Sequence, residues 1–82
     1  MHELSLAFDL VDRIQSIAVN EKVKSVDKVF ITIGELSGID PDSFLFAFPE
    51  AAKETLASQA KLFISITPDH EFQFNRMEVS DV

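Results

Sequence analysis

The spacing of the apolar residues changes along this chain, and that change constrains the fold more than any other feature of the sequence. Over residues 4–18, apolar side chains recur every three or four positions, which indicates an amphipathic helix. Over residues 28–34 they alternate instead, with Val29, Ile31 and Ile33 on one face and Phe30 on the other, which predicts a β-strand. A chain that uses both periods must pack a helix against a sheet.

A second helix is predicted to begin after the segment GELSGI. Asp40 suits the N-cap, Pro41 the first helical position and Asp42 the first turn. Apolar residues continue at helical spacing as far as Leu56, so we expect the helix to reach that residue. Pro49 lies inside this stretch and removes a backbone donor, which predicts a kink.

Two more strands are predicted in the segments KLFISIT and EFQFNRMEV. The turn TPDH between them, with Pro and Asp at its central positions, predicts an antiparallel hairpin. In the last segment Phe72 and Phe74 have even numbers, whereas Met77 and Val79 have odd numbers. Because alternate residues of a regular strand share a face, this change of parity would put the two pairs on opposite faces. A one-residue bulge near residues 75–76 would return all four side chains to one face.

These elements predict one α+β domain over residues 1–82. Its order is helix, strand, helix, strand, strand, with two helices packed on one face of a small three-stranded mixed sheet. Phe30 and Phe63 would then point away from the helices and form an apolar patch. Because such a patch is typical of a contact surface, one hypothesis is a protein interaction or dimerisation module without a metal function.

The charge of the chain excludes several classes of partner. The formal net charge is -7, and no cluster of Lys and Arg is present that could neutralise a phosphate backbone or an anionic membrane. No apolar run reaches the roughly 20 residues that a bilayer helix needs. The absence of cysteine excludes disulfides, thiolate metal sites and a Cys nucleophile. We expect a soluble, cytoplasmic protein that binds neither nucleic acid nor membrane.

Enzymatic chemistry has weak support in this sequence. No glycine-rich phosphate loop or nucleophile motif is present. Two carboxylate pairs, Glu3 with Glu35 and Asp40 with Asp42, could do acid and base work, but helix capping explains Asp40 and Asp42 more simply. An enzyme that uses Glu35 and Asp40 therefore ranks last, and we expect no catalytic activity.

The amino terminus, Met1-His2-Glu3, offers a possible metal chelate. The free amine of Met1, the backbone nitrogen of His2 and its imidazole Nδ1 can close adjacent five- and six-membered rings around one ion. Nitrogen donors in one plane suit Ni(II) or Cu(II). Glu3 could add its carboxylate or its backbone nitrogen. The simpler alternatives are a mobile terminal histidine, and a glutamate that favours a helix N-terminus.

Three segments together, MHELSLA, VDKVFITIGELSGIDPDSFLFAF and FQFNRMEV, closely resemble the HypA/HybF family of nickel metallochaperones, which act in the maturation of [NiFe] hydrogenase. The resemblance implies that His2, with the terminal amine and neighbouring backbone nitrogens, binds Ni(II). It also implies that Glu3 serves the nickel site or partner docking. The implied partners are a nickel GTPase of the HypB type, the hydrogenase large subunit and, in some bacteria, urease accessory proteins.

One departure from the family pattern concerns zinc. Typical members carry a zinc domain with two CxxC pairs before the last strand, whereas this chain has no cysteine, so we expect no zinc. The usual insertion point falls near residues 67–71, where the PDH turn joins the strands. Engineered removal is favoured over a natural reduced form, because the flanking strands look intact. His70 in this turn is a candidate fourth nickel ligand or an exposed turn residue, and the shortened turn suggests a homodimer formed by domain swapping.

Overall fold

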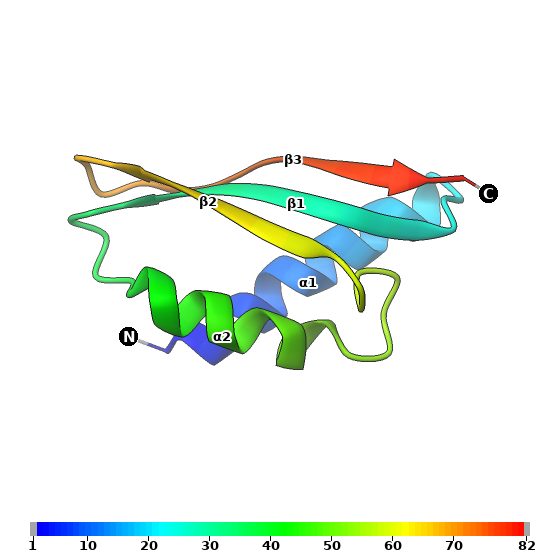
Figure 1. The fold of residues 1–82 in the computed structure, drawn as a ribbon, viewed down its shortest axis with the longest axis horizontal. Coiled ribbons are helices and arrows are strands. Elements are labelled where there is room, and N and C mark those ends of the chain that lie inside the picture. The colour runs from blue at the N-terminus through cyan, green and yellow to red at the C-terminus, as the bar shows by residue number, and fades with distance from the viewer. Residues whose placement is uncertain (1, 82) are drawn as a thin grey trace.

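The computed structural model describes residues 2–81, which form two helices and three strands. Along the chain these are α1 (Glu3–Asn20), β1 (Ser25–Gly34), α2 (Pro41–Ala52), β2 (Lys61–Thr67) and β3 (Phe72–Ser80). Figure 1 shows the sheet as one layer, with both helices covering the same face. The predicted α+β architecture is confirmed, and its element order is the one expected from the apolar pattern.

The core lies between the helices and the inner face of the sheet. The inward side chains of β1 are almost completely buried because β1 is the central strand, and they meet apolar stripes from both helices. The main members of this core are Ala7, Leu10, Val11, Ile14, Val29, Ile31, Ile33, Phe44 and Phe48. Each helix thus buries one stripe, as an amphipathic helix on a sheet must.

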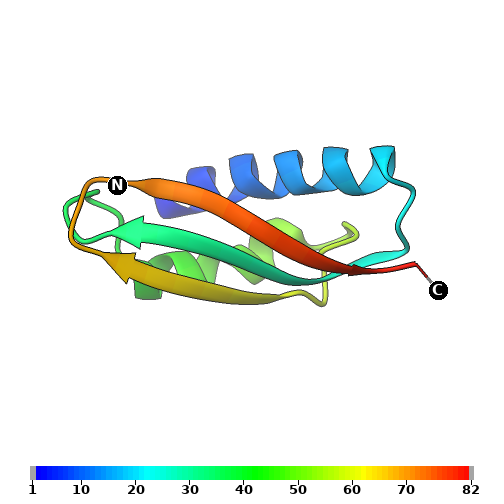
Figure 2. The same ribbon diagram turned by 90° about the horizontal axis from the view of Figure 1, so that it is seen from above.

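The sheet has the strand order β2-β1-β3, so the predicted hairpin of β2 and β3 is wrong. β1 pairs in parallel with β2 and antiparallel with β3, and Figure 2 shows it running between the other two strands. A segment of helix and loop separates β1 from β2, which is the kind of crossover that parallel pairing requires. A hairpin of β2 and β3 would put β1 at an edge of the sheet, although Val29, Ile31 and Ile33 on β1 are side chains that the core buries almost completely.

The connection of residues 68–71 crosses over the end of β1, because it joins the two edge strands. Two backbone bonds hold the connection there: the Gly34 N–H donates to the Glu71 carbonyl (2.7 Å), and the Leu36 N–H donates to the Asp69 carbonyl (2.8 Å). A third joins the adjoining end of β2, where the Thr67 carbonyl accepts from the Glu35 N–H (2.7 Å). A Cβ on Gly34 would lie 2.2 Å from the Asp69 carbonyl oxygen. Only glycine fits under this crossing without displacing it.

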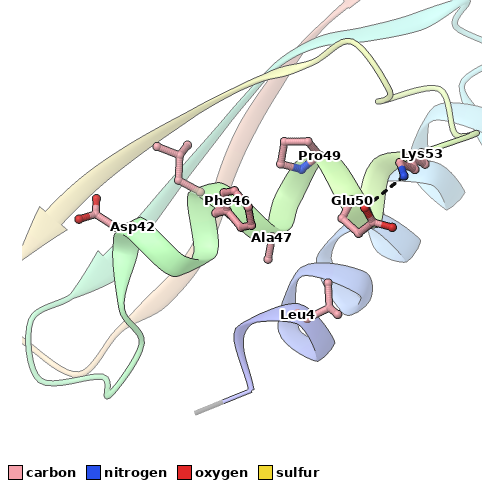
Figure 3. Close-up of a pocket in the computed structure, with 8 residues that line it drawn as sticks. Leu4, Asp42, Phe46, Ala47, Pro49, Glu50 and Lys53 are labelled. Atoms are coloured by element: carbon pink, nitrogen blue, oxygen red, sulfur yellow. Dashed lines mark ion pairs between the residues drawn. The ribbon is translucent and has the colours of Figure 1, made fainter.

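α2 ends earlier than the apolar pattern predicts. The helix runs through Pro49 (Figure 3) but stops at Ala52, because Lys53 has extended backbone angles (φ -53°, ψ 136°). Leu56, expected in the helix, has its backbone committed elsewhere: its N–H donates to the Gln15 side chain (2.9 Å), and its carbonyl accepts from the Val26 N–H (2.9 Å). These long-range bonds replace helical ones at the end of the predicted helix.

The bulge predicted in the last strand is confirmed. Phe30 pairs with Arg76 and Ile31 with Phe74, so Asn75 is the extra residue. Its side chain donates to the Thr32 hydroxyl (2.8 Å). The bulge places four side chains of β3 opposite the inward residues of β1, as the change of parity required: Phe72, Phe74, Met77 and Val79.

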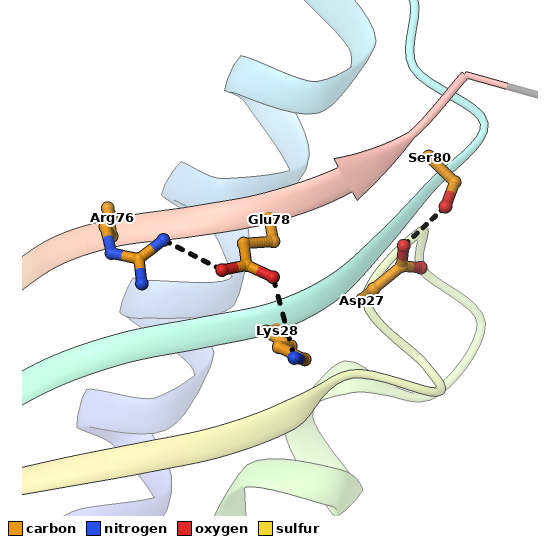
Figure 4. A network of polar contacts seen from close by, with 5 residues as sticks. All are labelled: Asp27, Lys28, Arg76, Glu78 and Ser80. Carbon is orange, nitrogen blue, oxygen red and sulfur yellow. Dashed lines mark hydrogen bonds and ion pairs between the residues drawn. The ribbon is translucent and has the colours of Figure 1, made fainter.

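A second bulge, at Asp27 of β1, lies beside a polar network on the open face (Figure 4). Asp27 accepts hydrogen bonds from Ser80 and Ser25, and these hold the pKa of its carboxyl below the ordinary value. Glu78 bridges Arg76 (3.0 Å) and Lys28 (3.6 Å). These exposed bonds lie where β1 and β3 pair near the end of the sheet, and they agree with the register that the buried side chains set.

Phe30 and Phe63 lie on the open face of the sheet, as predicted. Their rings stack with centroids 4.9 Å apart, and the guanidinium of Arg76 lies 3.9 Å from the centre of the Phe30 ring. The parallel register places the two residues directly opposite each other on β1 and β2. The apolar patch is therefore partly covered by a cation–π contact from β3.

Candidate metal site

His2 lies at the N-cap of α1, with its side chain exposed to solvent. Its carbonyl accepts the first helical bond from the Leu6 N–H (3.1 Å), whereas its imidazole makes no capping hydrogen bond. Ser, Thr, Asp or Asn at this position would normally use the side chain to satisfy the helix. Here the helix begins without that support, so the imidazole is available to an exogenous ligand.

Glu3 links the beginnings of the two helices. Its carboxylate oxygen Oε2 accepts a hydrogen bond from the backbone N–H of Asp40, the N-cap of α2, at 3.1 Å. This bond uses one oxygen of the carboxylate, so the carboxylate and the backbone nitrogen of Glu3 are both candidate donors. As the first helical residue, Glu3 has no intrahelical acceptor for its own N–H.

Sequence reasoning did not find this link between Glu3 and Asp40. The two residues are 37 positions apart, and no local pattern connects them. The contact fixes the first turn of α1 against α2, in the helix layer. A metal bound at the amino terminus would therefore be held by a chain segment that is anchored directly behind it.

The remaining candidate donors lie in different places. Met1, whose amine belongs to the predicted chelate, falls outside the described residues. Within residues 2–81, no group of three or more His, Asp and Glu side chains is arranged to hold a metal ion. A chelate of the predicted kind takes its donors from the Met1 amine, the backbone nitrogen of His2 and the His2 imidazole, and Glu3 could add its carboxylate or its backbone nitrogen.

His70 lies in the connection of residues 68–71, with Nδ1 3.0 Å from the Leu36 carbonyl oxygen. This connection is at the end of the sheet layer, whereas α1 begins in the helix layer (Figure 1). The neighbouring Asp69 accepts from the Thr67 hydroxyl (2.7 Å) and the Glu71 N–H (3.0 Å), which lowers the pKa of its carboxyl. The environment of His70 thus belongs to the crossing over β1.

Asp40 has the capping role expected from the sequence. One oxygen of its carboxylate accepts from the Ser43 hydroxyl (2.6 Å) and from the Ser43 N–H (2.9 Å). The hydroxyl contributes most to lowering the pKa of Asp40 below its ordinary value of 3.8, and the N–H adds to it. This carboxylate stabilises a helix, and nothing about its bonding resembles an acid or base awaiting a substrate.

We expect ionisation of the Asp40 carboxyl to make the free energy of unfolding depend on pH in the acidic range. A carboxyl whose pKa is lower in the folded state contributes stability above the unfolded pKa, and this is lost as the pH falls through the folded pKa. Asp40→Asn keeps a good N-cap but removes the titration. The free energy of unfolding should therefore fall less in the variant between about pH 5 and about pH 3, measured by urea titration. Equal losses in both proteins would contradict this assignment.

The match to a family model decides the family. Residues 1–72 match the model described as "Hydrogenase/urease nickel incorporation, metallochaperone, hypA". The chain belongs to the HypA family. That description is of a metal carrier rather than a catalyst, in agreement with the low rank given to an enzyme.

Relatives and solved structures agree with the family. The HypA hydrogenase maturation factor of Chlorobium limicola is 44% identical over 64 residues, covering 78% of this chain and 55% of the relative. That of Francisella philomiragia is 39% identical over 85 residues, covering 94% and 75%. The nickel metallochaperone HypA of Helicobacter pylori superposes with a TM-score of 0.73 at 30% identity, over 80% of this chain and 57% of its own.

A second solved structure, also of a HypA protein, shows the same fold. Its TM-score is 0.79 at 20% identity, and 96% of each chain is covered. This chain spans only about half of three curated relatives, since it covers 55% to 56% of their length. The family match covers residues 1–72, which contain both helices and the first two strands. Of the described helices, none is long and apolar enough to cross a membrane.

Proposed function

We propose that this HypA-family chain binds Ni(II) at its amino terminus and carries it to an enzyme precursor during [NiFe] hydrogenase maturation. The observation that carries the proposal is His2, an exposed N-cap residue whose imidazole takes no part in capping. The donors would be the Met1 amine, the backbone nitrogen of His2 and Nδ1 of His2, with Glu3 as a further ligand. The three nitrogens close adjacent five- and six-membered rings in one plane, which suits Ni(II).

The site suits a carrier rather than a storage protein. An exposed ion on the first residues of a helix can be reached by an acceptor without unfolding the domain. The donors must also lose protons before they bind, so binding releases protons and weakens in acid. For a terminal amine with a pKa of roughly 7.7 to 8.0, this weakening begins near neutral pH.

The proposed partners are a nickel GTPase of the HypB type and the hydrogenase large subunit, with urease accessory proteins as a second route. Membership of the HypA family supports these partners. The urease route is supported because the family is described as incorporating nickel into urease as well as hydrogenase. We also propose that a zinc domain is missing at residues 67–71, since longer relatives exist and the chain has no cysteine. In this fold that point lies in the crossing over Gly34 rather than at a hairpin tip.

A nickel titration of the untagged protein beside its N-terminally acetylated form tests the proposal. Acetylation removes the terminal amine as a donor and leaves the fold, His2 and Glu3 in place. We expect one equivalent of Ni(II) to bind the free form by equilibrium dialysis, and the acetylated form to bind far more weakly. Equal binding by the two forms would refute an amine chelate.

The stacked pair of Phe30 and Phe63 supports a second candidate, the interaction or dimerisation module. A homodimer by domain swapping belongs to this candidate, because the connection of residues 68–71 already links strands on opposite sides of β1. A molar mass from light scattering decides between monomer and dimer.

A further inference from the structure

The outer side of the helix layer carries a groove of about 730 Å³ that the nickel proposal does not use. Its floor is apolar: Leu4 comes from α1, and Leu45, Phe46 and Pro49 come from α2. In Figure 3, Leu4 rises from α1 toward α2, and the labelled α2 side chains lie along the groove. Phe46 is 87% exposed, and Leu4 and Leu45 are each 47% exposed.

The fold does not need these side chains. The core stripe of α2 consists of Phe44, Ala47, Phe48 and Ala51, which follow the helical period. Leu45, Phe46 and Pro49 form a second apolar stripe on the opposite side, where a surface helix normally carries polar residues. An apolar stripe that is left over after the core is complete marks a contact surface.

The charged residues that line this groove are Asp42, Glu50 and Lys53. Arg13, the cationic side chain of α1, turns away toward β3, where it lies 5.6 Å from the centre of the Phe74 ring. Asp42 lies at one end of the groove and Glu50 near the other, the latter paired with Lys53 at 3.2 Å. The groove thus has two carboxylates against one ammonium group, in a chain whose net charge is -7.

This charge selects the occupant. A second copy of a chain with net charge -7 would bring carboxylates against carboxylates, and an anionic membrane would also be repelled. A segment with an apolar stripe flanked by Lys or Arg is complementary to both the floor and the rim. A short groove between two helices accepts such a segment most readily as an amphipathic helix.

We propose that the groove formed by Leu4, Leu45, Phe46 and Pro49 binds a basic amphipathic helix of a partner protein. The apolar stripe of that helix would cover Phe46 and Leu4, and its cationic residues would face Asp42. Because Leu4 follows Glu3 directly, the bound helix would lie beside the amino terminus. The proposal goes beyond nickel binding and holds whether or not His2 binds the metal.

Designed peptides test the proposal without nickel. One peptide carries leucines at helical spacing flanked by lysines, and a second has glutamates in place of the lysines. We expect the lysine peptide to bind, with amide shifts in NMR spectra confined to the first turns of α1 and to α2, and its affinity to fall as salt is raised. The glutamate peptide should not bind. Equal binding of both peptides would overturn the proposal.

Two matched variants locate the contact. Phe46→Ser removes the most exposed aromatic of the groove, and Phe63→Ser removes an exposed aromatic from the opposite face of the molecule. We expect Phe46→Ser to weaken binding of the lysine peptide at least about tenfold and Phe63→Ser to leave it unchanged. Circular dichroism checks that both variants fold. Equal effects of the two, or a peptide that binds both as well as the parent, would refute the groove as the site.

Discussion

Replacing His2 with alanine is expected to lower the affinity for Ni(II) by more than about 100-fold, because the loss of a direct ligand should exceed the 10–100-fold cost of losing a residue that only supports one. The fold should not change, since the His2 side chain makes no capping bond and is exposed. Equilibrium dialysis gives the affinity, and circular dichroism with a thermal melt reports the fold.

His70→Ala is the matched control for that variant. His70 lies in the crossing over β1, where its ring contacts the Leu36 carbonyl. We expect nickel affinity to stay within about twofold of the parent, well inside the cost of losing even a supporting residue. A loss of affinity in His70→Ala as large as in His2→Ala would show instead that the two histidines share the ion. Loss of the fold in His2→Ala would show that His2 is structural.

Replacing Gly34 with alanine is expected to destabilise the domain by about 2–4 kcal/mol, through bonds that cost about 1 kcal/mol each to lose. The new Cβ would lie 2.2 Å from the Asp69 carbonyl oxygen, so the crossing must move. Moving it loosens the backbone bonds of Gly34, Glu35 and Leu36 to residues 67–71. For a domain of this size, that is a large part of the total stability.

Gly38→Asn separates this crowding from the general cost of changing a glycine. Gly38 has a φ of 82°, in the left-handed region that asparagine tolerates better than other residues. Its replacement should cost less than about 1 kcal/mol. Urea unfolding at neutral pH measures both variants. If Gly34→Ala and Gly38→Asn destabilise equally, the close approach of Asp69 does not explain the glycine at position 34.

Local patterns predicted much of this fold. The helical stripe of α1, the alternation in β1 and the Asp40-Pro41 start of α2 depend on residues close in sequence, and all three are confirmed. The bulge at Asn75 was also predictable, because a change of parity within one strand requires an extra residue. The residues that specify these features lie within the features themselves, so a local pattern is enough to predict them.

Long-range contacts explain what the patterns missed. The PDH turn resembles a hairpin turn, but the ladders of β1 with both edge strands decide the pairing. The end of α2 depends on bonds from Leu56 to Gln15 and Val26, which no local pattern reveals. At the site, the position of His2 is evident from the sequence, whereas the link from Glu3 to the Asp40 N–H required the fold.

The coordination of nickel in the untagged protein tests the central claim most directly. X-ray absorption at the nickel edge, recorded with one equivalent of Ni(II) above neutral pH, distinguishes planar from octahedral sites and nitrogen from oxygen donors. The proposed chelate predicts a four-coordinate planar ion with nitrogen donors and an imidazole contribution that disappears in His2→Ala. A six-coordinate ion with mainly oxygen donors, unchanged in His2→Ala, would contradict nickel binding by the amino terminus.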